Sequence, residues 1–172
     1  MLYALAMIEA GDPLPDATLN ESTEFGEACP IAPQKVSVAA ATRGKRVVIF
    51  GVPGAFTPTC SERHIPGYLE HLAGLKARGV DEVWCVSVND GYVMAAWGRD
   101  RGAIGKVRML GDGNGELTTK LGLDVDRSSG GMGRRSLRYS LLIEDGVVKR
   151  VNVEAPGKLE VSTAEAMLKQ LA

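Results

Sequence analysis

The apolar positions of this chain follow two patterns, and each pattern predicts one kind of element. Residues 45–52, KRVVIFGV, and residues 82–89, EVWCVSVN, are nearly continuous apolar runs, typical of strands covered on both faces. Residues 61–79 carry apolar side chains at helical spacing and end in a glycine, which predicts a helix. Because Pro66 cannot donate a hydrogen bond inside that helix, we expect a kink or a restart there.

Strands and helices continue to alternate beyond these runs. Residues 91–102 predict an amphipathic helix, residues 107–112 a strand, and residues 115–122 a short helix. Such alternation implies crossover connections and a partly parallel sheet. Nearer the N-terminus, residues 16–25 and 34–41 alternate weakly between apolar and polar, which predicts short strands at the edge of the sheet.

The pattern changes towards the C-terminus. Residues 138–154 alternate on both sides of Asp145-Gly146, a strong signal for an antiparallel hairpin. Residues 162–171 predict a closing helix, with Ser162 and Glu165 as a capping box. The sum is an α/β fold with a central mixed sheet, helices on both faces and an antiparallel C-terminal hairpin.

Length and composition favour one globular unit. The 172 residues contain no fixed-period repeat and no long linker, so we expect a single domain over 1–172. We interpret residues 1–6 as an upstream extension to a start at Met7. The first residues lack a basic segment and a small-residue cleavage pattern, which disfavours a secretory signal.

Charge and cysteine content narrow the functional classes. A net charge of −1 gives no basic footprint for nucleic acid, and 45% hydrophobic with 24% charged residues is the composition of a soluble protein without membrane insertion. The three cysteines are an odd number in a chain too large to need a disulfide framework. We therefore expect free thiols in a reducing compartment, the cytoplasm.

Cys60 stands where a buried strand gives way to a helix, and this position predicts a reactive thiol. The unpaired N–H groups and the positive end of a helix dipole favour the thiolate. Pro58 fits the start of a helix, Gly54 lets the backbone approach a small ligand, and Pro53 can shield the sulfur. An inert, half-buried cysteine remains the plainer alternative.

Two side chains near Cys60 in the sequence could assist it. Thr57 lies three residues earlier and can hold a hydroxylic substrate in line with the sulfur, although helix capping is the commoner role of such a threonine. His64 lies one helical turn later and could act as a base. We prefer a structural role for His64, as a histidine that packs or caps.

A thiolate also needs a cation, and the glycine-rich segment after residue 126 offers three arginines. Arg138 opens the apolar strand that follows, so the sheet fixes its position. We expect Arg134 and Arg135 to be solvated. Of the other cysteines, we interpret Cys85 as a core thiol within a buried strand. The role of Cys29 stays undecided.

Several separated segments resemble the peroxiredoxins, and most closely their peroxiredoxin-5 or type II branch. Residues 53–67, PGAFTPTCSERHIPG, meet the PxxxTxxC spacing of that family's active site. Residues 84–100, 105–116 and 131–154 are similar to the same branch, in the same order. The resemblance covers residues 8–154.

What the resemblance implies is a thioredoxin-like fold and a thiol-dependent peroxidase for hydrogen peroxide and alkyl hydroperoxides, without metal or organic cofactor. Cys60 would be the peroxidatic nucleophile, and Thr57 and Arg138 would orient and polarise the peroxide. Pro53 would shield the pocket, and backbone N–H groups around Thr59 would add donors to the transition state. A homodimer formed near the active-site loops is also implied.

The sulfenic acid formed on Cys60 must be reduced by another thiol. Animal members of the family carry a C-terminal resolving cysteine, and residues 155–168 contain none. Cys85 falls at the second cysteine of type II members, but a rigid strand would have to yield for a disulfide. We favour an external reductant, glutaredoxin with glutathione or thioredoxin, and keep the Cys85 disulfide as second choice.

Two other functions remain open at this point. A cysteine hydrolase would use Cys60 with His64 as base, but no residue nearby in the sequence is an evident orienter of the imidazole. A thioredoxin-fold redox sensor or holdase would pass the oxidation of Cys60 to a partner protein.

Overall fold

A computed structural model describes residues 6–172. The extension expected at residues 1–6 lies, apart from Ala6, outside these residues. Within the described part of the chain no helix combines the length and apolarity needed to cross a membrane.

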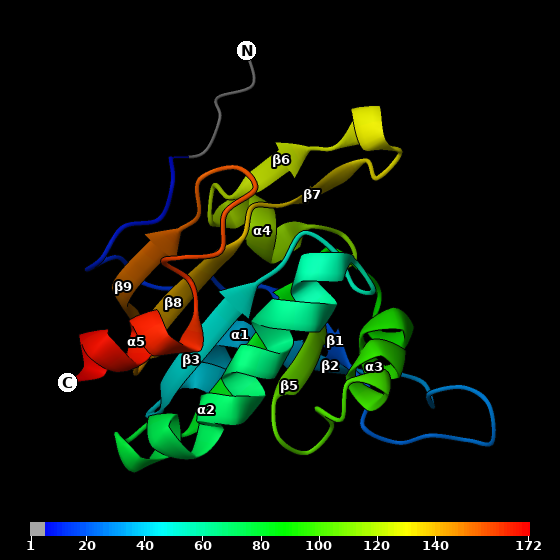
Figure 1. Cartoon of the computed structure of the whole chain (residues 1–172), viewed down its shortest axis with the longest axis horizontal. Helices are drawn as coiled ribbons and strands as arrows, with labels where there is room; N and C mark the ends of the chain where they lie inside the picture. The colour runs from blue at the N-terminus through cyan, green and yellow to red at the C-terminus, as the bar shows by residue number, and fades with distance from the viewer. Residues whose placement is uncertain (1–5) are drawn as a thin grey trace.

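A seven-stranded mixed sheet forms the centre of the molecule (Figure 1). The innermost strands β3, β4 and β5 run parallel, and the outer pairs β3–β8, β8–β9, β1–β5 and β1–β2 are antiparallel. The spatial order of the strands is β2 (Gln34–Ser37), β1 (Thr18–Glu21), β5 (Arg108–Gly111), β4 (Glu82–Ser87), β3 (Arg46–Gly51), β8 (Tyr139–Glu144) and β9 (Val147–Val153).

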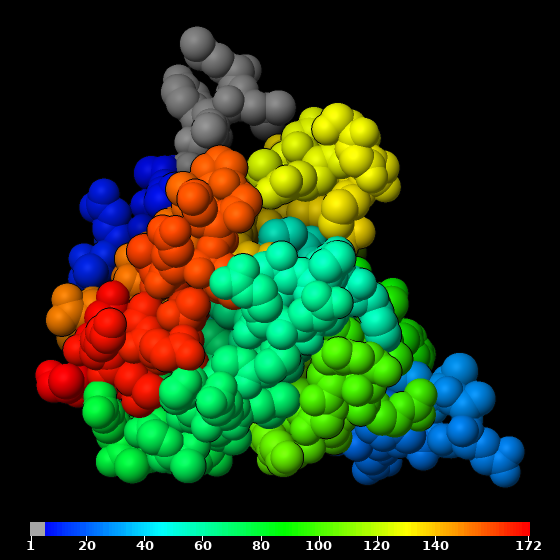
Figure 2. All heavy atoms as spheres, viewed as in Figure 1, coloured from blue at the N-terminus to red at the C-terminus, as the bar shows by residue number. Residues whose placement is uncertain are grey.

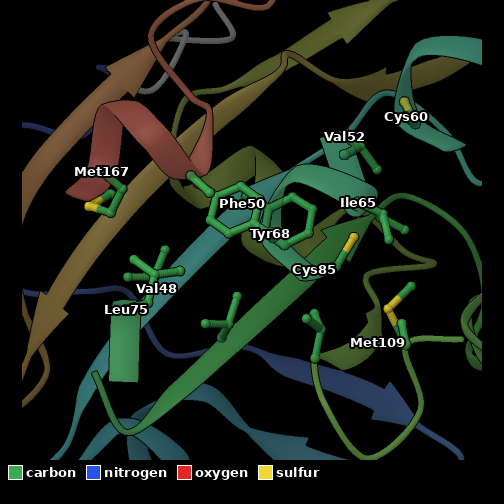
Figure 3. Packing of buried hydrophobic residues seen from close by; sticks show 14 of the residues in the cluster. Val48, Phe50, Val52, Cys60, Ile65, Tyr68, Leu75, Cys85, Met109 and Met167 are labelled. Atoms are coloured by element: carbon green, nitrogen blue, oxygen red, sulfur yellow. The ribbon is translucent and has the colours of Figure 1, made fainter. Parts of the chain in front are cut away.

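Helices cover both faces of this sheet and divide the core into two clusters of buried side chains. One cluster contains Phe50, Trp97 and Met167 and joins α2, α3 and α5 to the sheet (Figure 3). The other contains Val38 and Leu117 and lies under α1 and α4. The helices are α1 (Val38–Thr42), α2 (Ile65–Ala77), α3 (Gly91–Asp100), α4 (Glu116–Lys120) and α5 (Ala164–Leu171). The mixed sheet, its C-terminal hairpin and the helices on both faces are as predicted.

Four smaller elements lie around the carboxyl end of β3. A π-helical turn, η1 (Cys60–His64), leads directly into α2. The strands β6 (Asp124–Asp126) and β7 (Arg134–Ser136) pair as a separate ribbon, with the short 3-10 turn η2 (Ser128–Gly130) between them. Pro66 falls in the first turn of α2, directly after the change from π-helical to α-helical hydrogen bonding, in which Ile65 N still donates to Cys60 O. The predicted restart at Pro66 is confirmed.

Two local predictions were wrong. The strand expected over 34–41 ends at Ser37, whose hydroxyl accepts from Ala40 N at 3.2 Å and starts α1 instead, in a run rich in helix-favouring alanine. The capping box at Ser162 does not form. Thr163 caps α5 by accepting from Ala166 N, and the Ser162 hydroxyl donates to Glu154 instead.

Candidate active site

Cys60 is fully buried at the start of η1, beyond the loop that leaves β3. The first backbone hydrogen bond of this turn joins Ser61 N to Thr57 O at 3.0 Å, so the N–H groups of Thr59 and Cys60 precede the helical ladder. Phe56, in the loop, is half exposed and adopts a φ of 61°, a left-handed conformation that few large residues adopt. A strained loop thus delivers Cys60 to a helix N-terminus.

Arg138 brings a charged donor to the sulfur. Its Nη2 donates to Cys60 Sγ at 3.1 Å, and its Nη1 donates to His64 Nδ1 at 2.9 Å. Arg138 directly precedes β8, and its carbonyl accepts from Glu154 N at 3.0 Å, at the end of β9. The hairpin therefore positions the guanidinium, 78 residues away from Cys60 in the chain.

His64 is buried and serves Arg138 rather than Cys60. Its Nδ1 accepts from Arg138, so Nε2 carries the proton and donates to Ser162 O at 3.0 Å. Burial, and then the neighbouring Arg138 charge, lower the pKa of His64 to about 4, so the ring is neutral at pH 7. The ring also packs against Phe50 and Tyr68. The structural role preferred for His64 agrees with these contacts.

Two residues that the sequence did not single out complete this network. The Glu154 carboxylate accepts from the N–H groups of Glu160, Val161 and Ser162 and from the Ser162 hydroxyl at 2.7 Å. Burial opposes ionisation of Glu154, but these hydrogen bonds outweigh it and hold its pKa below the usual range. Tyr68 Oη donates to the same Ser162 carbonyl as His64. The only signal in the sequence was a carboxylate directly after an alternating strand.

Thr57 is placed to receive a hydroxylic substrate. Its hydroxyl donates to Gly54 O at 2.7 Å, which leaves the oxygen lone pairs as acceptors. Pro53, Thr57, Thr59 and Arg138 line one cleft of about 250 Å³. The predicted residues of the loop and the strand are thus brought together at one opening.

Gly54 and Arg135 pack against each other beside this cleft. A Cβ at Gly54 would lie 3.2 Å from Arg135 Nη1 and 3.3 Å from Met132 Cε. Arg135 is half-buried in β7, and its Nε donates to Met132 O at 2.9 Å. The expectation that Arg135 is solvated was therefore wrong, because the ribbon folds back onto the loop. Arg134 is exposed and pairs with Asp124 at 3.0 Å.

The other two cysteines lie in different environments. Cys85 is buried in β4 opposite Phe50, and Figure 3 shows it in the same cluster as Cys60. Burial raises the pKa of the Cys85 thiol well above its ordinary value, which disfavours the thiolate. Cys29 is exposed in the loop between β1 and β2, and all three cysteines are free thiols.

A tryptophan contacts the turn that carries the nucleophile. Trp97, buried in α3, donates from Nε1 to the hydroxyl of Ser61 at 2.9 Å. Phe56 of the strained loop lies 6.4 Å from the Trp97 ring, centroid to centroid. The indole thus touches the residue that follows Cys60.

A larger cavity of about 380 Å³ lies elsewhere, beside β4 and β5. Within its lining, Arg108 pairs with both Glu21 and Glu82 at 2.9 Å. None of its lining residues is a cysteine, so the smaller cleft beside Cys60 is the candidate site. No cluster of potential metal ligands occurs in residues 6–172.

Comparisons with known proteins agree on one family. A family model described as Redoxin matches residues 9–168. The chain is 45% identical to peroxiredoxin-2B of Arabidopsis thaliana, with 97% of this chain and 100% of that protein covered. It is 46% identical to the chloroplastic peroxiredoxin-2E of the same plant, over 96% of this chain and 70% of that protein. The crystal structure of reduced Prx3 from Vibrio vulnificus in complex with hydrogen peroxide matches with a TM-score of 0.88 at 46% identity, covering 96% of this chain and 100% of that one.

Proposed function

The chain belongs to the peroxiredoxin family and is a thiol-dependent peroxidase, and from that premise we propose that Cys60 is its peroxidatic nucleophile. The observation that carries the proposal is the 3.1 Å contact from Arg138 Nη2 to Cys60 Sγ. A buried sulfur that faces a positioned guanidinium at a helix N-terminus is suited to react as a thiolate.

The reaction follows from this geometry. The thiolate of Cys60 attacks the terminal oxygen of the hydroperoxide, an S–O bond forms and the O–O bond breaks. The electron pair leaves with the alkoxide, or with hydroxide when the substrate is hydrogen peroxide, and a proton from solvent completes the alcohol or water. Arg138 and the N–H groups of Thr59 and Cys60 stabilise the charge that develops on the leaving oxygen. Thr57 accepts a hydrogen bond from the peroxide hydroxyl, and Pro53 walls the cleft.

The oxidised sulfur then needs a thiol, and we propose that it comes from outside the chain: glutaredoxin with glutathione, or thioredoxin. Cys85 is held in a central strand, and burial raises its pKa, so it is a poor attacking thiol. A Cys60–Cys85 disulfide is the second choice. Mass spectrometry after one equivalent of peroxide decides between them, because a crosslinked peptide that disappears in Cys85→Ser would contradict the external reductant.

The peroxidase assignment of Cys60 is tested by Cys60→Ser, with Cys29→Ser and Cys85→Ser as matched controls. We expect Cys60→Ser to abolish thiol-dependent peroxide removal and both controls to retain it. Retained activity in Cys60→Ser would overturn the assignment. A wild-type rate constant close to that of free cysteine would indicate a redox sensor or holdase instead.

The contacts of His64 do not favour hydrolase chemistry. Nδ1 accepts from the Arg138 guanidinium and Nε2 donates to the Ser162 carbonyl, so neither nitrogen is directed at Cys60 as a base. We therefore assign His64 a positioning role towards Arg138.

We also propose a homodimer that forms through the active-site loops, and a cytoplasmic location. Phe56 and Tyr92 are both about half exposed, and Ala55 N donates to Asn89 Oδ1, which ties the two loops together. The test is sedimentation velocity of wild type and of Phe56→Asn, since asparagine tolerates the left-handed backbone.

The proposed cytoplasmic location rests on the free thiols, which support a reducing compartment. Cell fractionation tests the identity of that compartment.

A further inference from the structure

The cleft beside Cys60 has an outer end whose residues take no part in the mechanism above. Two loops form it: one after β6, which carries Arg127, and one after β9, which carries Lys158. Figure 1 shows the orange loop after β9 close to the ribbon of β6 and β7, and in Figure 2 the orange and yellow segments meet above the cyan segment that carries Cys60.

Backbone hydrogen bonds hold both cations in defined places. Arg127 N donates to Gly133 O at 2.7 Å and Met132 N returns to Arg127 O at 3.1 Å, which closes the loop across η2. Lys158 N donates to Ala155 O at 3.0 Å in a tight turn. The side chains of Arg127 and Lys158 therefore extend from anchored backbone rather than from free loops.

The charges at this end are only weakly compensated. Arg127 is exposed, and within residues 6–172 no carboxylate lies within ion-pair distance of it; the one contact of Lys158 is Glu160 at 3.9 Å. Glu154 is the single acid of the cleft wall, and its oxygens are already occupied by the donors of residues 160–162. Arg138 is committed to Cys60 and His64. Arg127 thus remains for a ligand, and Lys158 can join it because its one ion pair is long and exposed.

Apart from its charged residues and two threonines, the lining of the cleft is apolar. Pro53, Met132, Leu137 and Pro156 line it, and no further charged side chain does so apart from those already described. A ligand that fits such a cleft carries an anionic group at one end, an apolar or flexible stem, and its reacting group at the other end.

We propose that Arg127 and Lys158 recognise a carboxylate on the small molecule that reacts with Cys60. Arginine pairs with carboxylates through two parallel hydrogen bonds, and a lysine beside it adds a second charge. The inference rests on the peroxidase function of Cys60. Two reactants carry this chemistry: a hydroperoxide with a carboxylate, such as a hydroperoxy fatty acid, and glutathione.

Both reactions balance with the chemistry already assigned. With the hydroperoxy acid, Cys60 takes the terminal oxygen and the acid leaves as a hydroxy acid with its carboxylate unchanged. With glutathione, the thiol displaces the hydroxyl of the Cys60 sulfenic acid as water and forms a mixed disulfide. The thiolate of a second glutathione then attacks the glutathione sulfur of this mixed disulfide, which releases the Cys60 thiol and glutathione disulfide.

The experiment compares each carboxylate reactant with its neutral ester. Stopped-flow measurements follow the oxidation of Cys60 by linoleic acid hydroperoxide and by its methyl ester, and the reduction of the sulfenic acid by glutathione and by its diethyl ester. The proteins are wild type, Arg127→Gln, Lys158→Gln, the double variant, and Arg150→Gln as a control at an exposed position of β9. Hydrogen peroxide serves as a substrate without a carboxylate.

For at least one of the two acids, we expect the rate constant to fall about 3-fold in each single variant and about 10-fold in the double variant. Rates with the esters, with hydrogen peroxide and with Arg150→Gln should stay within about 2-fold of wild type, and added salt should reduce the acid preference of wild type. The arm that responds identifies the source of the carboxylate.

Equal losses for acids and esters, or no loss for either acid in the double variant, would overturn the inference while leaving hydrogen peroxide removal intact. Failure of the peroxidase function itself would instead appear as an absence of reaction between wild-type Cys60 and hydrogen peroxide.

Discussion

Arg138 serves two acceptors at once, and this sets the demands on its side chain. One guanidinium nitrogen donates to Cys60 Sγ and another to His64 Nδ1. Lysine presents a single ammonium on a flexible stem and cannot reproduce that fork. The geometry around the sulfur therefore depends on an arginine at this position.

We expect Arg138→Lys to lower the rate constant of Cys60 with hydrogen peroxide by about 100-fold, the loss typical for removal of one donor that stabilises developing charge. Stopped-flow kinetics measure it. Arg134→Lys, at an exposed arginine paired with Asp124, is the control and should react like wild type. A loss below about 3-fold in Arg138→Lys would contradict the role of the fork.

The buried His64 predicts a loss of stability in acid. Burial, and then the Arg138 charge, lower the pKa of His64 from 6.5 to about 4. Between these two pH values His64 is protonated in the unfolded chain and neutral in the folded protein. Stability is complete above about pH 6.5 and falls as the pH drops towards 4, by about 2.5 kcal/mol between pH 7 and pH 4.5.

Urea unfolding at several pH values measures this effect as the difference between wild type and His64→Gln. The variant should lose less stability than wild type across the same interval, although the carboxylates titrate in both proteins. Parallel curves would show that His64 takes up its proton over the same pH range in the folded and the unfolded chain, which would contradict a lowered pKa of the buried ring.

At the residue scale, the sequence indicated those contacts that local spacing encodes. Pro53, Thr57 and Cys60 lie within eight positions, and the strand start marked Arg138. Glu154 and Ser162 could not be predicted, because their contacts with each other and with His64 depend on how the hairpin and the C-terminal segment return to η1. No periodicity in the sequence records that return.

At the scale of elements, the close packing of β3 against β8 controls where the active-site loop begins. Gly51 is the last residue of β3 and pairs with Tyr139, the first residue of β8. A Cβ at Gly51 would lie 2.0 Å from the Tyr139 ring. The loop that carries Pro53 and Thr57 thus leaves the sheet over an aromatic ring that only glycine admits.

Gly51→Ala should therefore destabilise the fold by about 1–3 kcal/mol, the usual result of overpacking a core. Gly67→Ala is the matched control, because no atom lies within 4 Å of a Cβ at that position in α2, and alanine favours a helix by about 1 kcal/mol. Thermal and urea unfolding of both variants give the comparison. If Gly51→Ala were as stable as Gly67→Ala, the ring would be free to move aside.

Elements with a strong hydrophobic pattern were predicted correctly, whereas an element with a weak pattern was not. The continuous runs of β3 and β4 leave no alternative to a buried strand. Residues 34–41 combine weak alternation with an alanine run. Because Ser37 caps the following residues, the second half of this segment forms a short helix and not a strand. The start of α5 moved by one residue because Ser162 had a stronger partner in Glu154.

At the scale of the whole molecule, residues 154–163 join the hairpin to the helix that carries Cys60. Glu154 holds the N–H groups of residues 160–162, and the Ser162 carbonyl receives hydrogen bonds from His64 and Tyr68. The C-terminal segment thus reaches Arg138 through one carboxylate and one carbonyl. The family resemblance over residues 8–154 and the thioredoxin-like fold that it implies are confirmed at this scale.

Glu154→Gln should loosen this connection, because an amide has one oxygen where the carboxylate offers two acceptors. We expect a loss of about 1–3 kcal/mol in the free energy of unfolding and faster hydrogen exchange at the amides of residues 160–162. Glu160→Gln, whose side chain is exposed, is the control. Unchanged exchange in Glu154→Gln would show that the segment is held by other contacts.

The indole of Trp97 offers an optical signal for the chemistry of Cys60. Its hydrogen bond to the Ser61 hydroxyl makes its emission sensitive to any displacement of the turn. The second tryptophan, Trp84, instead lies beneath the Arg108 guanidinium at 5.3 Å and should stay constant as an internal reference. The oxidation and reduction of Cys60 should therefore be measurable in real time as a change in tryptophan fluorescence of the unlabelled protein. This change should be absent in Trp97→Phe.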